Sequence, residues 1–412
     1  MSEPQLEIQA LAAIVAVACA LPGVFLVLRR LALISDAISH AILLGIVVAF
    51  FAVKDLTSPV LVFGAALTGL LTVVLVELLE RTRLVREDAA IGLVFPVLFS
   101  IGVILIAHYA DDVHLDVDAV LLGELAFSPF ERVIVGDWDL GPKGLWVMGT
   151  ILALNIAFIV AFYKELKLVS FDAGLAVALG FSPAVVHYGL MSMVSVTAVG
   201  AFDAVGSILV VALMIAPPAT AYLLTDRLGL MLALSAAVGV ASAIAGYWFA
   251  HWLDVSIAGS MAAATGFCFA LAWLFAPERG LVALARRRRR QRWEFAQTML
   301  AIHLLNHEGS PEAAEESRVE HLTEHLGWEP QFANRVVRGA ERRGLVTPAA
   351  GRLVLTGRGR GVARRRSSTS GRLREPVRAR PGGRTRAAKA APGRRARAGS
   401  RPRPGRRAFC RR

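Results

Sequence analysis

One acidic and one imidazole side chain lie inside a stretch hydrophobic enough to cross a bilayer. Residues 31–50 read LALISDAISHAILLGIVVAF, in which Asp36 and His40 are the ionisable residues. Four residues apart, they share one face of a helix. An ionisable pair in hydrocarbon is costly and suggests a functional site, and carboxylate plus imidazole suits Zn, Mn or Fe. On spacing alone, a pair that bonds only to itself or to a neighbouring helix is an equally good interpretation.

The rest of the chain supplies the membrane helices that would position this pair. The protein has 412 residues and is 55% hydrophobic, well above the composition of soluble proteins. Its apolar residues form runs of roughly 20, the length that crosses a bilayer. The sequence predicts nine spans, near 8–28, 32–53, 59–79, 89–108, 144–163, 184–202, 205–224, 228–250 and 257–276. We interpret the second as a span, with a break or a re-entrant segment around its polar residues as the alternative.

Lysine and arginine positions predict the orientation. Basic residues follow the first, third, fifth, seventh and ninth spans, whereas the alternate connections are acidic or nearly neutral. By the positive-inside rule, the N-terminus is outside and the C-terminus in the cytosol. We therefore expect a multi-pass protein of the cell inner (cytoplasmic) membrane. The 109–143 connection fits least well, and an amphipathic helix at the interface is expected in part of it.

Three regions follow from the composition: a transmembrane domain at 1–280, a linker and small cytosolic domain at 281–363, and a tail at 364–412. In the second region, helices are expected at 293–306, 312–326 and 331–343, followed by two short strands. This order is a winged helix-turn-helix layout. The fold class is therefore an all-α polytopic membrane protein of eight to nine transmembrane helices with a small winged helix-turn-helix domain.

The tail holds most of the basic charge. Residues 364–412 contain 19 Lys and Arg and one acid, which makes +18, and the whole chain carries +13. The other residues therefore sum to −5. Few apolar residues lie in the tail, so we expect it to be disordered. It is either simply solvated, or bound to anionic lipid, or bound to DNA, in that order of preference.

Four segments in order resemble the metal-cation permease family of ABC importers, the manganese/zinc/iron class, over about residues 8–276. They are RR at 29–30 with SDAISHA at 35–41 and Gly45, DAVLLGEL at 118–125, SFDAGLAVALG at 170–180, and VG at 205–206 through APPATA at 216–221. The resemblance implies a homodimeric or heterodimeric permease, a separate cytosolic ATPase and an extracytoplasmic metal-binding protein. It also implies that Asp36 and His40 line the metal path.

The sequence between residues 164 and 183 is the sizeable early cytosolic segment that an ATPase could push on. Phe171, Asp172 and Gly180 are its candidate contacts. No Walker-type GxxxxGK[ST] motif occurs in the sequence, so we expect a transport subunit and not an enzyme. No cofactor is expected, since the divalent metal ion is the substrate.

Residues 297–357 resemble the winged-helix half of iron-dependent repressors. The likeness rests on HLTEHLG at 321–327, ANRVV at 333–337, RGLV at 343–346 and GRLVLT at 351–356. The metal-binding and dimerisation half of those repressors has no counterpart here. A metal-sensing repressor function is therefore not expected.

Further acids are weaker candidates for the cation path. Asp111 and Asp112 belong to an acidic cluster at the outer end of the fourth span, which would concentrate cations or be an ordinary solvated loop. Asp203 lies between the sixth and seventh spans and is as readily a helix N-cap as a metal contact. The leading hypothesis is an ABC importer permease for Mn, Zn or Fe. The alternatives are a gradient-driven metal transporter and a membrane-tethered DNA-binding regulator.

Overall fold

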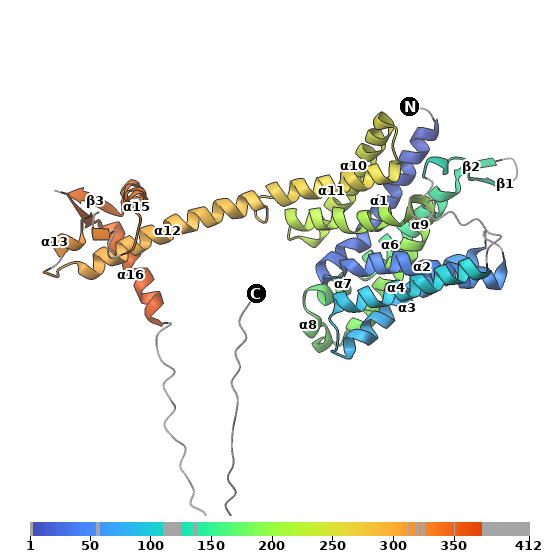
Figure 1. Ribbon diagram of the computed structural model, residues 1–412, viewed down its shortest axis with the longest axis horizontal. Coiled ribbons are helices and arrows are strands. Elements are labelled where there is room, and N and C mark those ends of the chain that lie inside the picture. Colours follow the sequence, from blue (N-terminus) through green and yellow to red (C-terminus); the bar gives the residue numbers. More distant parts are fainter. Residues whose placement is uncertain are drawn as a thin grey trace, which may run out of the picture. The chain divides into compact units, whose positions relative to one another are not determined.

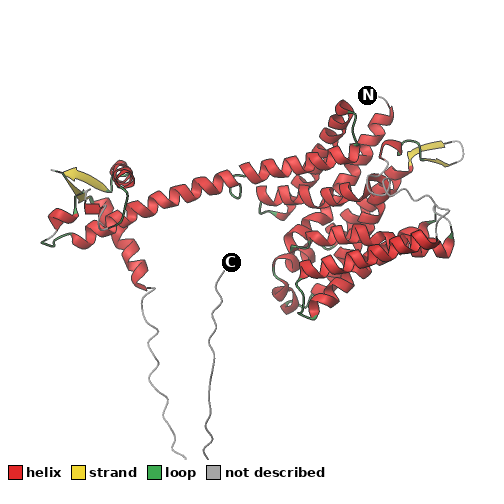
Figure 2. Ribbon diagram, viewed as in Figure 1, coloured by secondary structure: helices red, strands yellow, loops and turns green. Residues whose placement is uncertain are grey.

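The computed structural model describes residues 3–54, 58–109, 125–135, 138–311, 313–318, 321–322, 326–349 and 351–372. These residues are mostly helical, with two small hairpins (Figures 1 and 2). The chain divides into two compact units, Met1–Gln291 and Arg292–Arg412. The division falls inside a long helix, α12 (Leu281–His307), eleven residues beyond the expected boundary at residue 280.

Within the described ranges, eight helices are long and apolar enough to cross a membrane. They are α1 (Glu3–Arg29), α2 (Ala32–Val53), α3 (Pro59–Arg81), α4 (Glu87–Tyr109), α6 (Lys143–Ala161), α9 (Pro183–Leu224), α10 (Leu228–Leu253) and α11 (Ile257–Phe275). They coincide with the predicted spans, except that α9 contains both the sixth and the seventh. The predicted class of all-α polytopic membrane protein is confirmed.

Helix α9 doubles back on itself at Gly206. Its 42 residues would measure about 63 Å if straight, about twice the hydrocarbon core of a bilayer. Gly206 has φ 75° and ψ 164°, a backbone conformation open to glycine. In the first half of α9, Thr197 is linked to Ala18 of α1 because the Asn155 side-chain amide donates hydrogen bonds to both. In the second half, Met214 packs against Gly23, which lies further along α1. Because Asp203 lies beside Leu11, the two halves are antiparallel along α1.

Helix α2 runs unbroken from Ala32 to Val53, so the alternative of a broken or re-entrant second span is wrong. It packs tightly against α3. A Cβ atom on Gly45 would lie 2.3 Å from the carbonyl oxygen of Gly64 and 2.5 Å from Thr68 Oγ1. The absence of side chains at both glycines lets the two backbones touch.

The connection between α4 and α6 contains a hairpin that the sequence did not predict. A 3₁₀ turn, η1 (Leu125–Phe127), precedes β1 (Arg132–Val135) and β2 (Trp138–Pro142), which pair antiparallel. The expected amphipathic helix is absent from the described part of this connection, at 125–135 and 138–142. Arg132 explains part of the arrangement, because it bonds both Asp139 across the hairpin and Glu7 at the start of α1.

Two short helices, α7 (Tyr163–Phe171) and α8 (Ala173–Ala178), form the segment between α6 and α9. Asp172 separates them and caps α8, since its Oδ1 accepts a hydrogen bond of 2.9 Å from the Leu175 amide. Leu166 of α7 is fully buried. This burial fixes α7 against the membrane helices while much of α8 remains exposed.

The second unit contains the end of α12, the short α13 (Ala313–Glu316), α15 (Pro330–Arg342), strands β3 (Val346–Ala349) and β4 (Arg352–Leu355), and α16 (Gly357–Arg372). Its core joins Leu300, Leu322, Val336, Leu353 and Ala363. The hairpin agrees with the sequence. Within the expected helix over 312–326, the described residues are helical at Ala313–Glu316 and at 321–322, with a turn at 317–318. Helix α16 continues beyond residue 364, where a disordered tail was expected to begin. Residues 373–412 lie outside the described part.

Candidate metal pathway

Asp36 and His40 face each other across one turn of α2. His40 Nε2 lies 3.5 Å from Asp36 Oδ1, and the two side chains are 30% and 42% exposed respectively. The predicted placement on one helix face is therefore what the structure shows. Because both groups remain reachable, their oxygen and nitrogen atoms can bind one divalent cation between them. The pair is not sealed in the protein core.

The neighbouring helix α4 supports the His40 ring. Phe95 and Phe99 lie with ring centroids 5.8 Å and 6.2 Å from that of His40, and Phe99 meets it edge to face. Ser39, beside His40, does not contact the pair through its hydroxyl, because Ser39 Oγ donates a hydrogen bond of 2.9 Å to the Ser35 carbonyl. Across the part of the chain that the structure describes, no third His, Cys, Asp or Glu completes a metal-binding group.

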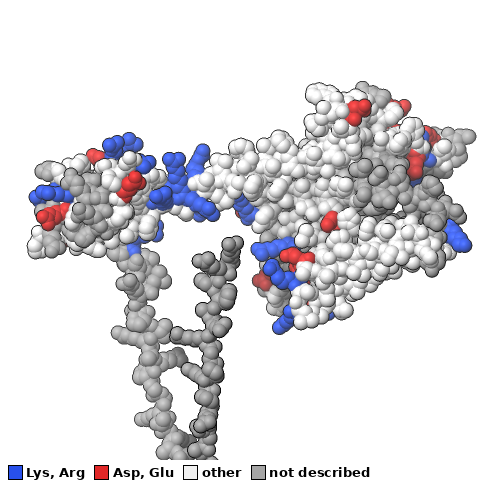
Figure 3. Space-filling model, in the orientation of Figure 1, with Lys and Arg blue, Asp and Glu red and all other residues white. Residues whose placement is uncertain are grey.

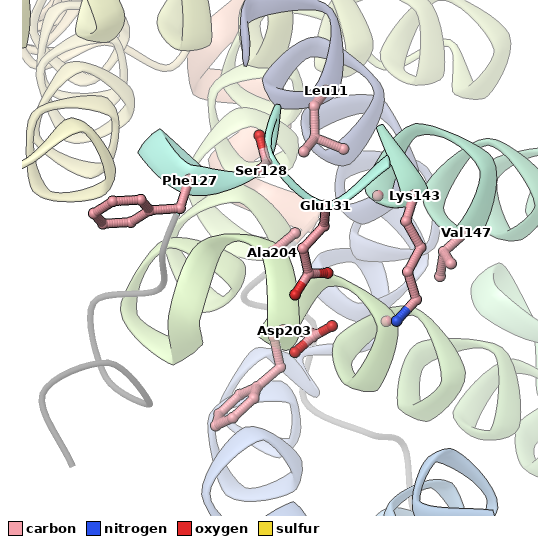
Figure 4. Close-up of a pocket in the computed structure, with 11 residues that line it drawn as sticks. Leu11, Phe127, Ser128, Glu131, Lys143, Val147, Asp203 and Ala204 are labelled. Atoms are coloured by element: carbon pink, nitrogen blue, oxygen red, sulfur yellow. The ribbon is translucent and has the colours of Figure 1, made fainter. Parts of the chain in front are cut away.

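Asp203 lies apart from this pair, at a cavity of about 240 Å³ near the turn of α9. Glu131 precedes β1 and Lys143 begins α6, and both line the same cavity. Figure 4 shows the carboxylates of Glu131 and Asp203 pointing towards one another. The sequence prediction singled out Asp203 but missed Glu131, because no pattern within residues 125–143 indicates that they fold back over the membrane helices. Asp111 and Asp112 lie outside the described residues.

Phe171, Asp172 and Gly180 gather on the α7–α8 segment as predicted. Phe171 is 60% exposed, and exposed apolar residues continue along α8 and beyond it at Leu175, Val177, Leu179 and Phe181. Gly180 has φ +85° and no atom within 4 Å of a would-be Cβ. An exposed apolar surface on a capped helix is suited to contact another protein. Asp172 acts as the N-cap of α8.

A group of charged and polar residues that the sequence did not indicate joins three membrane helices. Glu77 of α3 lies 3.3 Å from His187 Nε2 of α9 and 3.4 Å from Arg81 Nη2, and it accepts a short hydrogen bond from Tyr188. Arg29 at the end of α1 donates a hydrogen bond of 3.1 Å to Ser170 Oγ of α7. Arg81 is a local partner, four residues from Glu77. Tyr188 is 111 residues from Glu77 and Ser170 is 141 residues from Arg29, so no local spacing could reveal these pairs.

On the face of the membrane unit that Figure 3 draws, few charged side chains lie along the middle of the helices. Figure 3 shows its helices mostly white, with Lys, Arg, Asp and Glu gathered towards their ends. At one end, Asp139 bonds Arg132 at 2.6 Å and accepts from the Gly141 amide at 2.9 Å. The Gly141 amide, followed by the Arg132 guanidinium, lowers the pKa of the Asp139 carboxyl. These features together define a polytopic membrane protein with a polar pair inside one span, which is the pattern of a transport protein.

The profile of the ABC 3 transport family matches residues 5–276. This range covers most of the chain, so the protein belongs to the ABC 3 transport family. The chain is 47% identical over 365 residues to the zinc transport system membrane protein TroD of Treponema pallidum, covering 89% of this chain and 99% of TroD. It is 52% identical over 269 residues to the manganese transport system membrane protein MntD of Bacillus subtilis, covering 65% of this chain and 91% of MntD.

A solved structure, PsaBC from Streptococcus pneumoniae in complex with Fab, matches with a TM-score of 0.59 and 27% identity. The match covers 69% of this chain and 96% of that one. The similarity to TroD reaches further, because 365 aligned residues exceed the 291 residues of the first unit. The alignment with TroD therefore includes part of the second unit. The predicted permease of an ABC importer for Mn, Zn or Fe is confirmed as the class of protein.

Proposed function

We propose that this chain forms the metal-conducting subunit of an importer in the cytoplasmic membrane, with Asp36 and His40 as ligands on the metal path. The observation that supports the proposal most directly is the pair itself, 3.5 Å apart on one face of a membrane helix and still partly exposed. A metal ion leaving its water shell needs replacement ligands within the hydrocarbon region. One carboxylate and one imidazole provide them for Mn, Zn or Fe alike.

Only two ligands come from α2, so the remaining coordination positions are filled by water, by backbone oxygens or by a partner. A second permease subunit, identical or related, is the proposed partner across the membrane. An extracytoplasmic metal-binding protein delivers the ion, and the N-terminus lies on that side. Asp203 and Glu131 belong to the delivery face in this arrangement, with Asp111 and Asp112 as further candidates.

A separate cytosolic ATPase drives transport by contacting α7 and α8. The exposed side chain of Phe171, the cap made by Asp172 and the open space around Gly180 support this assignment. The absence of a phosphate-binding loop in the sequence is in keeping with energy from another subunit. Family membership does not favour the gradient-driven transporter.

The test is uptake of labelled Mn, Zn and Fe by cells carrying the complete transport system. We expect uptake of at least one of these ions to require both this chain and its ATPase partner. Uptake that persists without any associated ATPase contradicts the proposal and supports a gradient-driven transporter. Mass spectrometry of the metal in the purified complex then identifies the ion.

The second unit is proposed to be a winged helix-turn-helix with the C-terminus in the cytosol. Support comes from its element order, in which α12, α13 and α15 precede the β3–β4 hairpin. The basic tail is proposed to be simply solvated, with contact to anionic lipid and then to DNA as the alternatives. Binding of the full complex to DNA would fall by orders of magnitude between about 50 and 200 mM salt if it rests on phosphate contacts alone. A preference of at least ~1,000-fold for one DNA sequence would favour the regulator instead.

A further inference from the structure

Glu77 occupies the centre of a polar network that connects the α7–α8 segment with the helix beside the metal pair. On α9 its partners are His187 and Tyr188, which follow the α7–α8 segment directly. On its own helix its partner is Arg81. Arg29 of α1 is hydrogen-bonded to Ser170, near the end of α7. Through His187 and Tyr188 the network therefore reaches the beginning of α9, the helix that follows α8 in the chain.

The network is partly buried and incompletely bonded. The side chains of His187 and Glu77 are 18% and 29% exposed. Arg29 Nη2 and His187 Nε2 are buried and have no hydrogen-bond partner among the described residues, although His187 Nε2 lies near Glu77. Unmade hydrogen bonds at buried groups are costly. The groups of such a network can exchange hydrogen-bond partners when α7 moves. A network that served only to stabilise the fold would not leave buried groups without hydrogen bonds.

Helix α3 carries Glu77 to the level of the metal pair. The antiparallel packing of α2 and α3 sets Gly45 against Gly64 and Thr68. On α2, Asp36 lies nine residues before Gly45. On α3, residues 73–77 lie nine residues after the contact at 64–68. Glu77 therefore lies within about one turn of the level of Asp36 along the bundle. Because the two backbones touch at the glycines, α3 cannot shift without moving α2.

We infer that Glu77 is a positioning residue that transmits movement of the α7–α8 segment, through α3, to Asp36 and His40 on α2. Tyr188 and His187 are the contacts that move with the segment, and the glycine contact between α2 and α3 carries the movement onward. Glu77 itself does not bind the transported ion. The inference rests on the proposed function, since it requires an ATPase that pushes on α7 and α8.

The test measures metal transported per ATP hydrolysed by the complete complex in proteoliposomes. Glu77→Ala is expected to lower this ratio at least about tenfold while ATP hydrolysis continues. Tyr188→Phe removes one hydrogen bond and keeps the ring, so a smaller decrease in the same ratio is expected. Glu80→Ala is the matched control, because Glu80 is an exposed carboxylate on the same helix, one turn further on. The metal transported per ATP hydrolysed by Glu80→Ala is expected to equal that of the wild type.

The outcomes separate this inference from the proposed function. If the wild-type complex shows no ATP-dependent uptake of Mn, Zn or Fe, the proposed function is wrong. If the wild type transports but Glu77→Ala and Tyr188→Phe keep the wild-type ratio, the inference is overturned. A proportional loss of uptake and hydrolysis also overturns it, because that pattern reports general destabilisation. Should Glu77→Ala fail to fold, Tyr188→Phe alone decides.

Discussion

The carbonyl oxygen of Gly64 occupies the place where a side chain on Gly45 would begin. A Cβ atom there would lie 2.3 Å from that oxygen, closer than real Cβ atoms approach any backbone atom. The contact joins α2, which carries the proposed metal ligands, to α3. A single added methyl group at Gly45 therefore has to push the two helices apart.

Gly45→Ala should destabilise the folded protein by about 1–3 kcal/mol, the usual cost of overpacking. The measurement is thermal unfolding in detergent. Gly92→Ala on α4 is the control, since nothing lies within 4 Å of its would-be Cβ and alanine favours helices. Equal melting temperatures for the two variants would contradict backbone contact between α2 and α3.

Asp36→Ala and His40→Ala should each abolish metal uptake while the protein still inserts in the membrane. Each change removes one ligand and leaves the other without its neighbour. His40→Phe is a sharper variant, because a phenyl ring can keep the contacts to Phe95 and Phe99 but offers no nitrogen. Uptake at limiting metal is the measurement. Wild-type uptake by both alanine variants would remove these residues from the metal path.

Gly180→Glu should uncouple ATP hydrolysis from transport. The φ of +85° is strained for any residue with a side chain, and the open space around Gly180 lets a glutamate project outward. Crosslinks from residues 170–180 to the ATPase subunit, present in the wild type, should weaken in the variant. Gly309→Glu adds the same charge at another glycine of positive φ, +90°, with equal space and outside the membrane helices, and it tests for a general effect of charge. Undiminished crosslinking in Gly180→Glu would speak against this contact.

The β1–β2 hairpin should lose order in acid. The pKa of Asp139 is lowered in the folded protein by the Gly141 amide and Arg132. A lowered pKa means that the stabilisation is present above the unfolded value of about 3.9 and is lost as pH falls through the folded value. Hydrogen exchange at Gly141, corrected for intrinsic rates, should be constant from neutral pH to about pH 4 and faster below. Asp139→Asn should remove most of that change; an unchanged acid profile would contradict the assignment.

Removing residues 373–412 should leave transport at saturating metal unchanged, whereas removing 357–412 should destabilise the second unit. The reason is α16, in which Ala363 is fully buried against the core of that unit. The boundary therefore lies after Arg372 and not at residue 364. Limited proteolysis of the full complex distinguishes the two truncations. Similar protease resistance for both would mean that α16 adds nothing to the fold.

Hydrophobic length predicted the membrane helices well, because a span must be apolar over its whole extent. The break between the sixth and seventh spans was also predicted, since Asp203 interrupts two apolar runs. The one-face placement of Asp36 and His40 followed from a spacing of four. These properties are all local, and each is written in a few consecutive residues.

Long-range contacts were not predictable in this way. Glu77 gave no signal of its partners His187 and Tyr188, because a carboxylate near a helix end is also what a solvated surface requires. The β1–β2 hairpin depends on Arg132 reaching Glu7, which is 125 residues away. α16 was missed because its composition of Arg, Gly and Ser is poor in helix-stabilising apolar residues, and Ala363 is an inconspicuous anchor.

The reversal of α9 at Gly206 bears on how the chain enters the membrane during synthesis. With no polar loop between them, the two halves have to leave the translocation machinery together, as one helical hairpin. Asp203 then lies at the tip of that hairpin, three residues before Gly206. A mutation that separates the halves would show itself first as a defect of biogenesis, in protein that is synthesised but degraded before it can assemble.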